Sequence, residues 1–240
     1  MKKIIGLAVL ATAAGVGAAS AEGTVSANIA ITSDYVFRGV SLSDNGPAIQ
    51  GGVDYVADMF YVGAWASSLV EDMEIDLYGG FTPSTGPVDW DLGLIAYFYP
   101  GADDDGNEFD YAELKVGAST EIGERFTLGG AAYYAPENYG DTGEALYLEI
   151  NGEFTINDRL GFSAAFGNQS VDDADGPLPG VTEEDSYYTW NIGGTYALHG
   201  FEVDLRYHDT DIDAGSDIEA YTYGESSYDS AFVITIGREL

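Results

Sequence analysis

The sequence predicts an all-β protein that folds as a single antiparallel transmembrane β-barrel of about twelve strands, with short periplasmic turns and longer extracellular loops. Three observations lead to this prediction. Apolar residues recur at every second position, the connections between segments alternate between short and long, and aromatic residues gather towards the segment ends. The exported part of the sequence carries no helical periodicity.

The first 21 residues have the pattern of a cleaved secretory signal peptide. Lys2 and Lys3 form a positive start, an apolar stretch of about 16 residues follows, and Ala19-Ser20-Ala21 is an A-x-A cleavage site. The alternative, a membrane anchor helix, would need roughly 20 apolar residues. We therefore expect Sec-type export, a signal peptide over residues 1–21 and a barrel over residues 22–240.

Twelve segments of the remaining chain alternate apolar and polar residues, which is the side-chain period of a β-strand. In the fourth segment, Ile75 and Leu77 alternate with Glu74, Asp76 and Tyr78. In order, the segments are 25–37, 48–55, 60–67, 74–78, 88–98, 111–118, 126–134, 146–153, 160–166, 188–196, 201–208 and 231–240. An even number of strands near the length that crosses a tilted bilayer is typical of an outer-membrane barrel.

The connections fall into two length classes that alternate along the chain. The connections after the odd segments cover 38–46, 70–72, 99–109, 136–143, 169–186 and 210–229, and most are long and acidic. The connections after the even segments cover 57–59, 82–87, 120–125, 155–159 and 198–200, and all are short. Short turns at one rim and long loops at the other indicate a barrel in an outer membrane.

Alternation alone also fits a soluble β-sandwich, so the positions of the aromatic residues decide between a sandwich and a membrane barrel. Many lie near segment ends, where the girdles of a membrane barrel would be. They are Tyr35, Phe37, Trp65, Trp90, Phe98, Tyr134, Phe154, Phe162, Phe166, Tyr188, Trp190, Tyr196, Phe201 and Tyr207. The last segment alternates up to Leu240, as expected of a closing strand that the barrel assembly machinery reads.

Composition and charge exclude several classes of function. The 240 residues include 8 Lys+Arg and 41 Asp+Glu, a formal net charge of -33, so no basic face for nucleic acid is available. The chain has no Cys, which excludes disulfides, cysteine-based zinc sites and Cys nucleophiles. We predict no cofactor, no metal requirement and no nucleic-acid partner.

Two stretches near the start resemble the opening signature of the TorF-type porin family: TSDYVFRGVS at residues 32–41 and PAIQGGVDY at residues 47–55. Members of that family are exported bacterial proteins assigned as outer-membrane barrels. The resemblance is specific over residues 24–68 and rests on length and strand rhythm beyond them. It implies a barrel fold, an outer-membrane location and a channel activity, and it supplies no functional residues.

If the apolar set faces lipid, the opposite set lines the lumen, the space inside the barrel. Carboxylates outnumber cations in this set, which favours cations and small neutral solutes. The candidate lumen and selectivity residues are Asp34, Arg38, Asp54, Glu74, Asp76, Asp89, Asp91, Glu113, Lys115, Glu149, Glu202, Asp204 and Arg206, with Gln50, Glu153 and His208 on the same face. Alternatively, Lys115 and Arg206 pair with neighbouring Glu113 and Asp204 and fill the barrel.

Arg38 follows an aromatic residue at the outer end of the first segment, on the same face as Asp34. It is either a cation in a constriction zone or part of a salt bridge that holds the first loop. In the first case its removal changes conductance, and in the second it changes only the order of the loop.

Two other functional classes stay open. The acidic stretches 103–108, 172–176 and 209–213 are either solvated loops or weak divalent sites, and the barrel could be a plugged structural or adhesive one. A lipid hydrolase would need a triad, and of two histidines only His208, beside Asp209, is near the outer rim. We predict a non-enzymatic channel whose partners are outer-membrane lipid, lipopolysaccharide, the barrel assembly machinery and small solutes or ions. The oligomeric state is not predicted.

Overall fold

The structure is a computed structural model that describes residues 23–70, 72–102, 109–172, 186–214 and 226–240. The predicted signal peptide, residues 1–21, lies outside the described residues. The regular structure of the described residues consists of β-strands. None of the described residues belongs to a helix long and apolar enough to cross a membrane.

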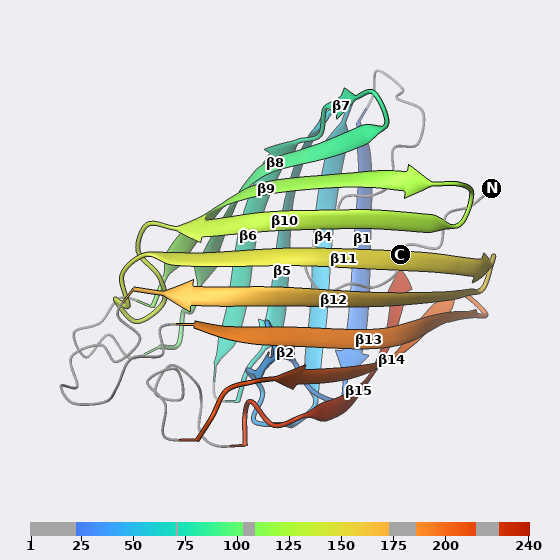
Figure 1. Cartoon of the computed structure of the whole chain (residues 1–240). Helices are drawn as coiled ribbons and strands as arrows, with labels where there is room; N and C mark the ends of the chain where they lie inside the picture. Colours follow the sequence, from blue (N-terminus) through green and yellow to red (C-terminus); the bar gives the residue numbers. More distant parts are fainter. Residues whose placement is uncertain (1–22, 71, 103–108, 173–185, 215–225) are drawn as a thin grey trace.

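Twelve long antiparallel strands form one closed sheet (Figure 1). They are β1 (Thr24–Thr32), β4 (Ala48–Ala57), β5 (Phe60–Ser68), β6 (Met73–Phe81), β8 (Val88–Phe98), β9 (Tyr111–Ile122), β10 (Phe126–Ala135), β11 (Ala145–Asn157), β12 (Leu160–Val171), β13 (Ser186–Leu198), β14 (Phe201–Thr210) and β15 (Ala231–Glu239). Three short strands are added: β2 (Val36–Phe37), β3 (Val40–Ser41) and β7 (Ser84–Thr85). The prediction of a twelve-stranded barrel is confirmed.

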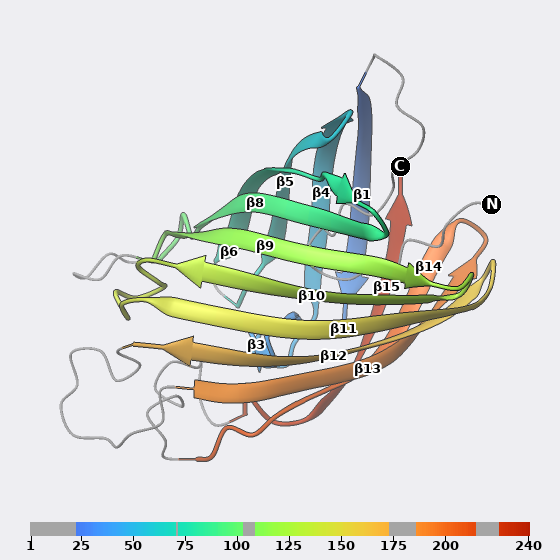
Figure 2. The ribbon, with the colours of Figure 1, turned by 45° about the horizontal axis from the view of Figure 1, so that its top comes forward.

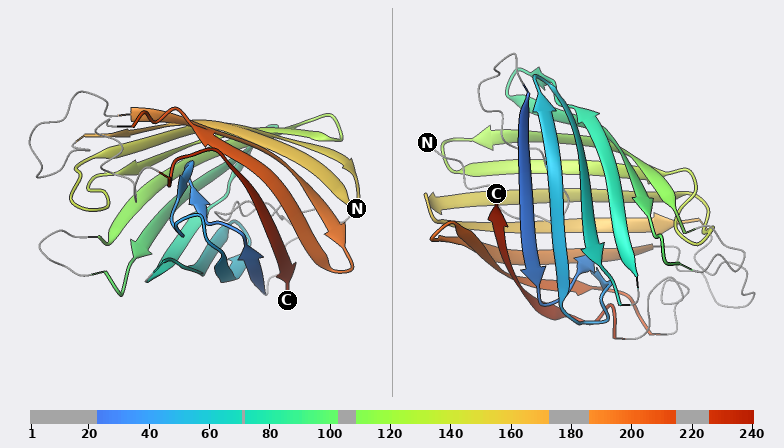
Figure 3. Two further views of the ribbon diagram at one scale, coloured as in Figure 1. Left: turned by 90° about the horizontal axis from the view of Figure 1, so that it is seen from below. Right: turned by 180° about the vertical axis from the view of Figure 1, so that it is seen from behind.

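The ring closes where the first long strand pairs with the last. β1 lies between β4 and β15, with Thr32 opposite Thr235, and β6 pairs with β8 in the same ring. β8 to β13 form the wall at the front of Figure 1 and Figure 2, and Figure 3 shows β1, β4, β5 and β6 on the far side. A closed ring leaves no long strand with an unpaired edge, which is the condition for crossing hydrocarbon.

Alternate side chains of every long strand point out of the ring. Ile29 and Ile31 of β1 are exposed, while Ala30 between them and Thr32 after them are buried. Ile192, at the middle of β13, is 60% exposed. An exterior of bare aliphatic side chains would be unfavourable in water and suits a lipid environment.

Exposed aromatic residues lie beside the short turns, as the girdle prediction requires: Phe60, Trp90, Phe154, Phe162, Tyr196 and Phe201. The prediction is wrong for Tyr35, Phe37 and Trp65. Tyr35 is buried and packs edge-on against Trp65, with ring centroids 5.5 Å apart, and Phe37 packs against buried Tyr97. Tyr35 and Phe37 belong to the lumen because the segment that carries them turns into the barrel, and Trp65 lies on the inward face of β5 with Tyr61 and Ser67.

The loop parity is as predicted, but the first strand is shorter than predicted. β1 ends at Thr32, and Val36–Phe37, predicted to continue it, pairs instead with Val40–Ser41 as a separate two-stranded sheet. The Asp34 carboxylate accepts hydrogen bonds from Ser41 Oγ at 2.6 Å and Ser43 Oγ at 2.9 Å. These bonds bend the first loop back on itself.

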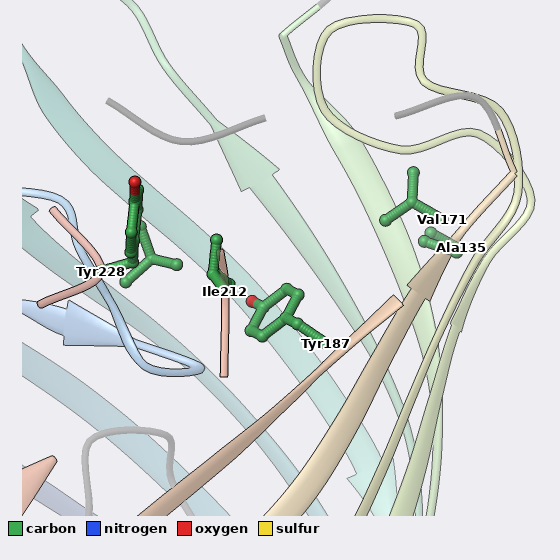
Figure 4. Close-up of a cluster of buried hydrophobic side chains, with 7 residues drawn as sticks. Ala135, Val171, Tyr187, Ile212 and Tyr228 are labelled. Atoms are coloured by element: carbon green, nitrogen blue, oxygen red, sulfur yellow. The ribbon is translucent and has the colours of Figure 1, made fainter. Parts of the chain in front are cut away.

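A cluster of buried apolar side chains lies at the long-loop end of the barrel. Val40 of β3 packs there with Ala135, Val171 and Tyr187, at the ends of β10, β12 and β13, and with Ile212 and Tyr228, which follow β14 and precede β15. Figure 4 shows Tyr187, Ile212 and Tyr228 in a row, with Ala135 and Val171 near one another. The cluster fixes the short hairpin against the wall by burying apolar surface.

Candidate functional site in the barrel lumen

The lumen is crossed by a short hairpin made of β2, Arg38-Gly39 and β3, which we call the lumen hairpin (residues 36–41). Its two turn residues both have positive φ, 48° for Arg38 and 87° for Gly39. This is the backbone of a tight two-residue hairpin turn, in which Gly is favoured. The turn places the Arg38 side chain among residues of the opposite wall.

Arg38 is bound by two side chains of the wall and surrounded by rings. One guanidinium nitrogen is 2.7 Å from Glu113 Oε2 and another donates to Gln169 Oε1 at 2.9 Å. The guanidinium carbon lies 4.4 Å from the ring centre of Tyr147 and 5.2 Å from that of Tyr133. Arg38 is therefore both the cation of a buried ion pair and the tie that holds the hairpin inside the lumen. Asp34, the neighbour expected from the sequence, is instead bound by serines.

Tyrosine hydroxyls also bind two lumen carboxylates near the hairpin, Glu74 and Glu113. Glu74, 1% exposed, accepts from Tyr35 at 2.5 Å and from Tyr99 at 2.7 Å. Tyr97 donates to Glu113 at 3.0 Å. Burial, followed by the charge of Glu74, raises the pKa of Tyr35 well above its ordinary value, so its hydroxyl stays a donor at neutral and moderately alkaline pH.

The same pairing recurs elsewhere in the lumen. Nearer the short turns, Tyr78 donates to Asp54 at 2.6 Å and Tyr61 to Asp91 at 2.7 Å, and close to the hairpin Tyr147 donates to Glu149 at 3.1 Å. These tyrosines share the strand faces of the carboxylates, so period-two counting places them inside. What the sequence analysis missed is their role as hydrogen-bond donors to the acidic lumen.

Two further cations lie in the lumen, each in an ion pair. Lys115 Nζ is 2.6 Å from Asp91 Oδ2, so the alternative that pairs Lys115 with Glu113 is wrong. Arg206 is 3.0 Å from Asp204 Oδ2, as that alternative expected, and also donates to Asn191 and Ser163. Both pairs lie within the barrel interior, away from its lipid-facing side.

Inward glycines make room for these tyrosine rings. A Cβ added to Gly63 would lie 2.5 Å from ring atoms of Tyr78, and one added to Gly80 would meet Tyr61. Gly167 is covered in the same way by Tyr147. The Gly and Tyr residues of neighbouring strands are therefore complementary in size, which lets the rings lie flat against the wall.

The predicted lumen residues are not one cluster. Asp34, Arg38, Glu74, Asp76, Glu113 and Glu149 lie at or near the hairpin, and Asp54, Asp91, Lys115, Asp204 and Arg206 lie further along the lumen. Asp89 is exposed at the short-turn rim, where it accepts from Ser84, and Glu202 is a half-buried residue next to another short turn. Asp89 and Glu202 are thus rim residues rather than part of a constriction.

The acidic loop stretches are only partly described: residues 103–108 and 173–176 lie outside the described residues. In the third stretch, Asp209 accepts from Tyr207 at 2.7 Å and Asp211 from the Tyr188 amide at 2.6 Å. The residues that the structure describes contain no group of three or more His, Asp or Glu arranged to hold a metal ion.

Gly39→Ala is expected to displace the lumen hairpin. An added Cβ would lie 2.5 Å from Thr189 Oγ1 and against Thr210 Cγ2, at a φ that side chains disfavour. The matched control is Gly86→Ala, at a φ of 63° with nothing within 4 Å. Trypsin, which cuts after arginine, should cleave Gly39→Ala after Arg38 faster than wild type and Gly86→Ala at the wild-type rate. Equal cleavage of all three would show that the hairpin tolerates the side chain.

The closed ring of twelve antiparallel strands, the apolar exterior and the polar lumen define the fold class of the outer-membrane porins. The chain belongs to the family described as "Bacterial protein of unknown function (Gcw_chp)", whose model matches residues 16–240. The narrower label, the TorF-type family, is not confirmed by this match and stays a prediction. A sequence search of curated proteins finds no match.

Solved structures confirm the fold. The structure titled "KdgM porin" matches with a TM-score of 0.58 at 6% identity, over 89% of this chain and 98% of that one. A structure from a study of the in-meso crystallization of membrane proteins matches with a TM-score of 0.50 at 9% identity, over 90% and 83%. The outer membrane channel DcaP of Acinetobacter baumannii matches with a TM-score of 0.48 at 10% identity, over 92% and 99%. At identities this low, the first two of these matches establish the fold of this chain alone.

Proposed function

We propose that the protein is an outer-membrane channel for passive diffusion of small solutes or ions, exported by a Sec-type signal peptide and inserted by the barrel assembly machinery. The porin-like barrel and its apolar exterior support this proposal. In this role the exterior contacts lipid and lipopolysaccharide, and the protein performs no catalysis.

We further propose that the channel prefers cations, and one observation carries this. Each of the three described lumen cations, Arg38, Lys115 and Arg206, is in an ion pair with a carboxylate. Asp54, Glu74 and Glu149 receive hydrogen bonds from neutral hydroxyls instead. The lumen therefore keeps an excess of negative charge, and rings of negative charge repel anions.

The test is the reversal potential of refolded protein in a planar bilayer under a gradient of potassium chloride. Wild type should show cation preference, and Asp54→Asn should reduce it because the Asp54 carboxylate lies in the lumen. Asp58→Asn is the control, since Asp58 is in a short turn outside the lumen and its positive φ suits Asn. An anion-selective wild type would overturn the charge argument.

A plugged structural or adhesive barrel is the second candidate, and the lumen hairpin is the observation that favours it. The hairpin is held by an ion pair and by apolar packing, as a permanent plug would be. Conductance separates the two: a plugged barrel passes no current in wild type, whereas a channel conducts with the hairpin in place.

A further inference from the structure

Asp76 is a buried carboxylate that lacks a partner for one of its oxygens. It points into the lumen from β6 and is 3% exposed. Its Oδ1 atom is buried and has no hydrogen-bond partner. The neighbouring carboxylates differ, because Glu74 accepts from two tyrosines and Glu113 from Tyr97 and Arg38.

Aromatic side chains flank Asp76 on both sides of its strand. Trp65 of β5 and Tyr97 of β8 are its directly opposite partners in the antiparallel register, and all three face the lumen. Directly opposite residues have Cβ atoms about 4.5–5.5 Å apart. The Tyr97 hydroxyl is engaged with Glu113 and the Trp65 ring with Tyr35, so the carboxylate stands between two rings that are fixed by other contacts.

The buried negative charges around the hairpin outnumber the positive ones. Three buried carboxylates, Glu74, Asp76 and Glu113, lie around the hairpin, and the described cation among them is Arg38, which pairs with Glu113. Hydroxyl donors stabilise Glu74. An ionised buried carboxylate without a counter-charge is costly, so a cation bound beside Asp76 would stabilise its charged form.

We propose that Asp76, Trp65 and Tyr97 form a binding site for one small monovalent cation of about potassium size. The carboxylate supplies the charge, and the rings supply the cation–π attraction that weakly hydrated monovalent ions accept. Divalent ions need several oxygen ligands, and no group of three or more metal-ligating side chains occurs within the described ranges. This site rests on the proposed function and adds to it a specific cation-binding position along the permeation pathway.

Tryptophan fluorescence tests the site without requiring any current. Trp90→Phe and Trp190→Phe together leave Trp65 as the only tryptophan. Thallous ion, a heavy analogue of potassium that quenches indole, should quench Trp65 in a saturable way in the folded protein, and potassium should compete. N-methylglucamine, which is too large, should not compete.

Asp76→Asn in this background should abolish the saturable phase, and Asp76→Glu, which keeps the charge, should retain it. Asp89→Asn is the matched control, since it removes the same charge at the rim. A heat-modifiable gel shift verifies that each variant is folded. Quenching that does not saturate, or that is the same in Asp76→Asn, would overturn the site even in a barrel that conducts cations. Saturable quenching in a barrel that passes no current would refute only the channel.

Discussion

Arg38→Ala is expected to conduct more current than wild type. The substitution removes the guanidinium that ties the lumen hairpin to Glu113 and Gln169 and leaves Glu113 buried without its cation. Breaking a buried ion pair by removing one partner costs about 3–5 kcal/mol, more than a two-strand hairpin is expected to supply on its own. The hairpin should leave its docked position, which widens the lumen. Single-channel recordings should show a larger and noisier open level.

Two variants isolate this effect. Arg159→Ala removes the same side chain from an exposed short turn and should leave conductance unchanged. Arg38→Ala combined with Glu113→Gln removes the unpaired charge and should regain stability while keeping the wide lumen. If Arg38→Ala conducts like wild type, the hairpin is held by the apolar cluster around Val40, and the ion pair is not its main tie.

Ile192→Arg is expected to destabilise the barrel in a lipid bilayer. Ile192 is the central residue of β13 and points outward, 60% exposed. Arginine on the lipid face costs about 2–4 kcal/mol at the bilayer midplane and about 0–1 kcal/mol near the interface. Denaturant titration in lipid vesicles should therefore show a loss of about 2–4 kcal/mol for this variant.

Leu198→Arg is the depth control for Ile192→Arg. Leu198 is on the same strand and face, 44% exposed, but at the end of β13 beside a short turn. It should lose little stability in vesicles. Equal losses at both positions would contradict a membrane location for this surface, because only a bilayer makes the cost depend on depth.

The barrel could be predicted because its signals are local. The alternation of Ile75 and Leu77 with Glu74 and Asp76 determines which side chains face out, and loop length determines which rim a connection occupies. Both follow from strand geometry alone. Neither needs knowledge of distant residues.

The lumen contacts could not be predicted because they depend on register and on distant strands. Lys115 lies opposite Gly93, which brings it diagonally to Asp91. β8 and β9 are joined by a long loop, so no tight turn determines this register. The lumen hairpin resembles an ordinary outer loop in sequence, and its inward position depends on Glu113 and Gln169, 75 and 131 residues further along.

Closure of the ring by β1 and β15 has a consequence for the order of folding. The Thr32 and Thr235 hydroxyls meet at 2.9 Å across that seam, 203 residues apart in the chain. The Ser41 amide of the hairpin donates to the Ser227 carbonyl at 2.6 Å, just before the last strand. Contacts between such distant segments form slowly, because long chain loops must close first. The hydrogen bond between Ser41 and Ser227 can therefore form only once the segment before the last strand is in place, so the docking of the hairpin is completed late, when the ring closes.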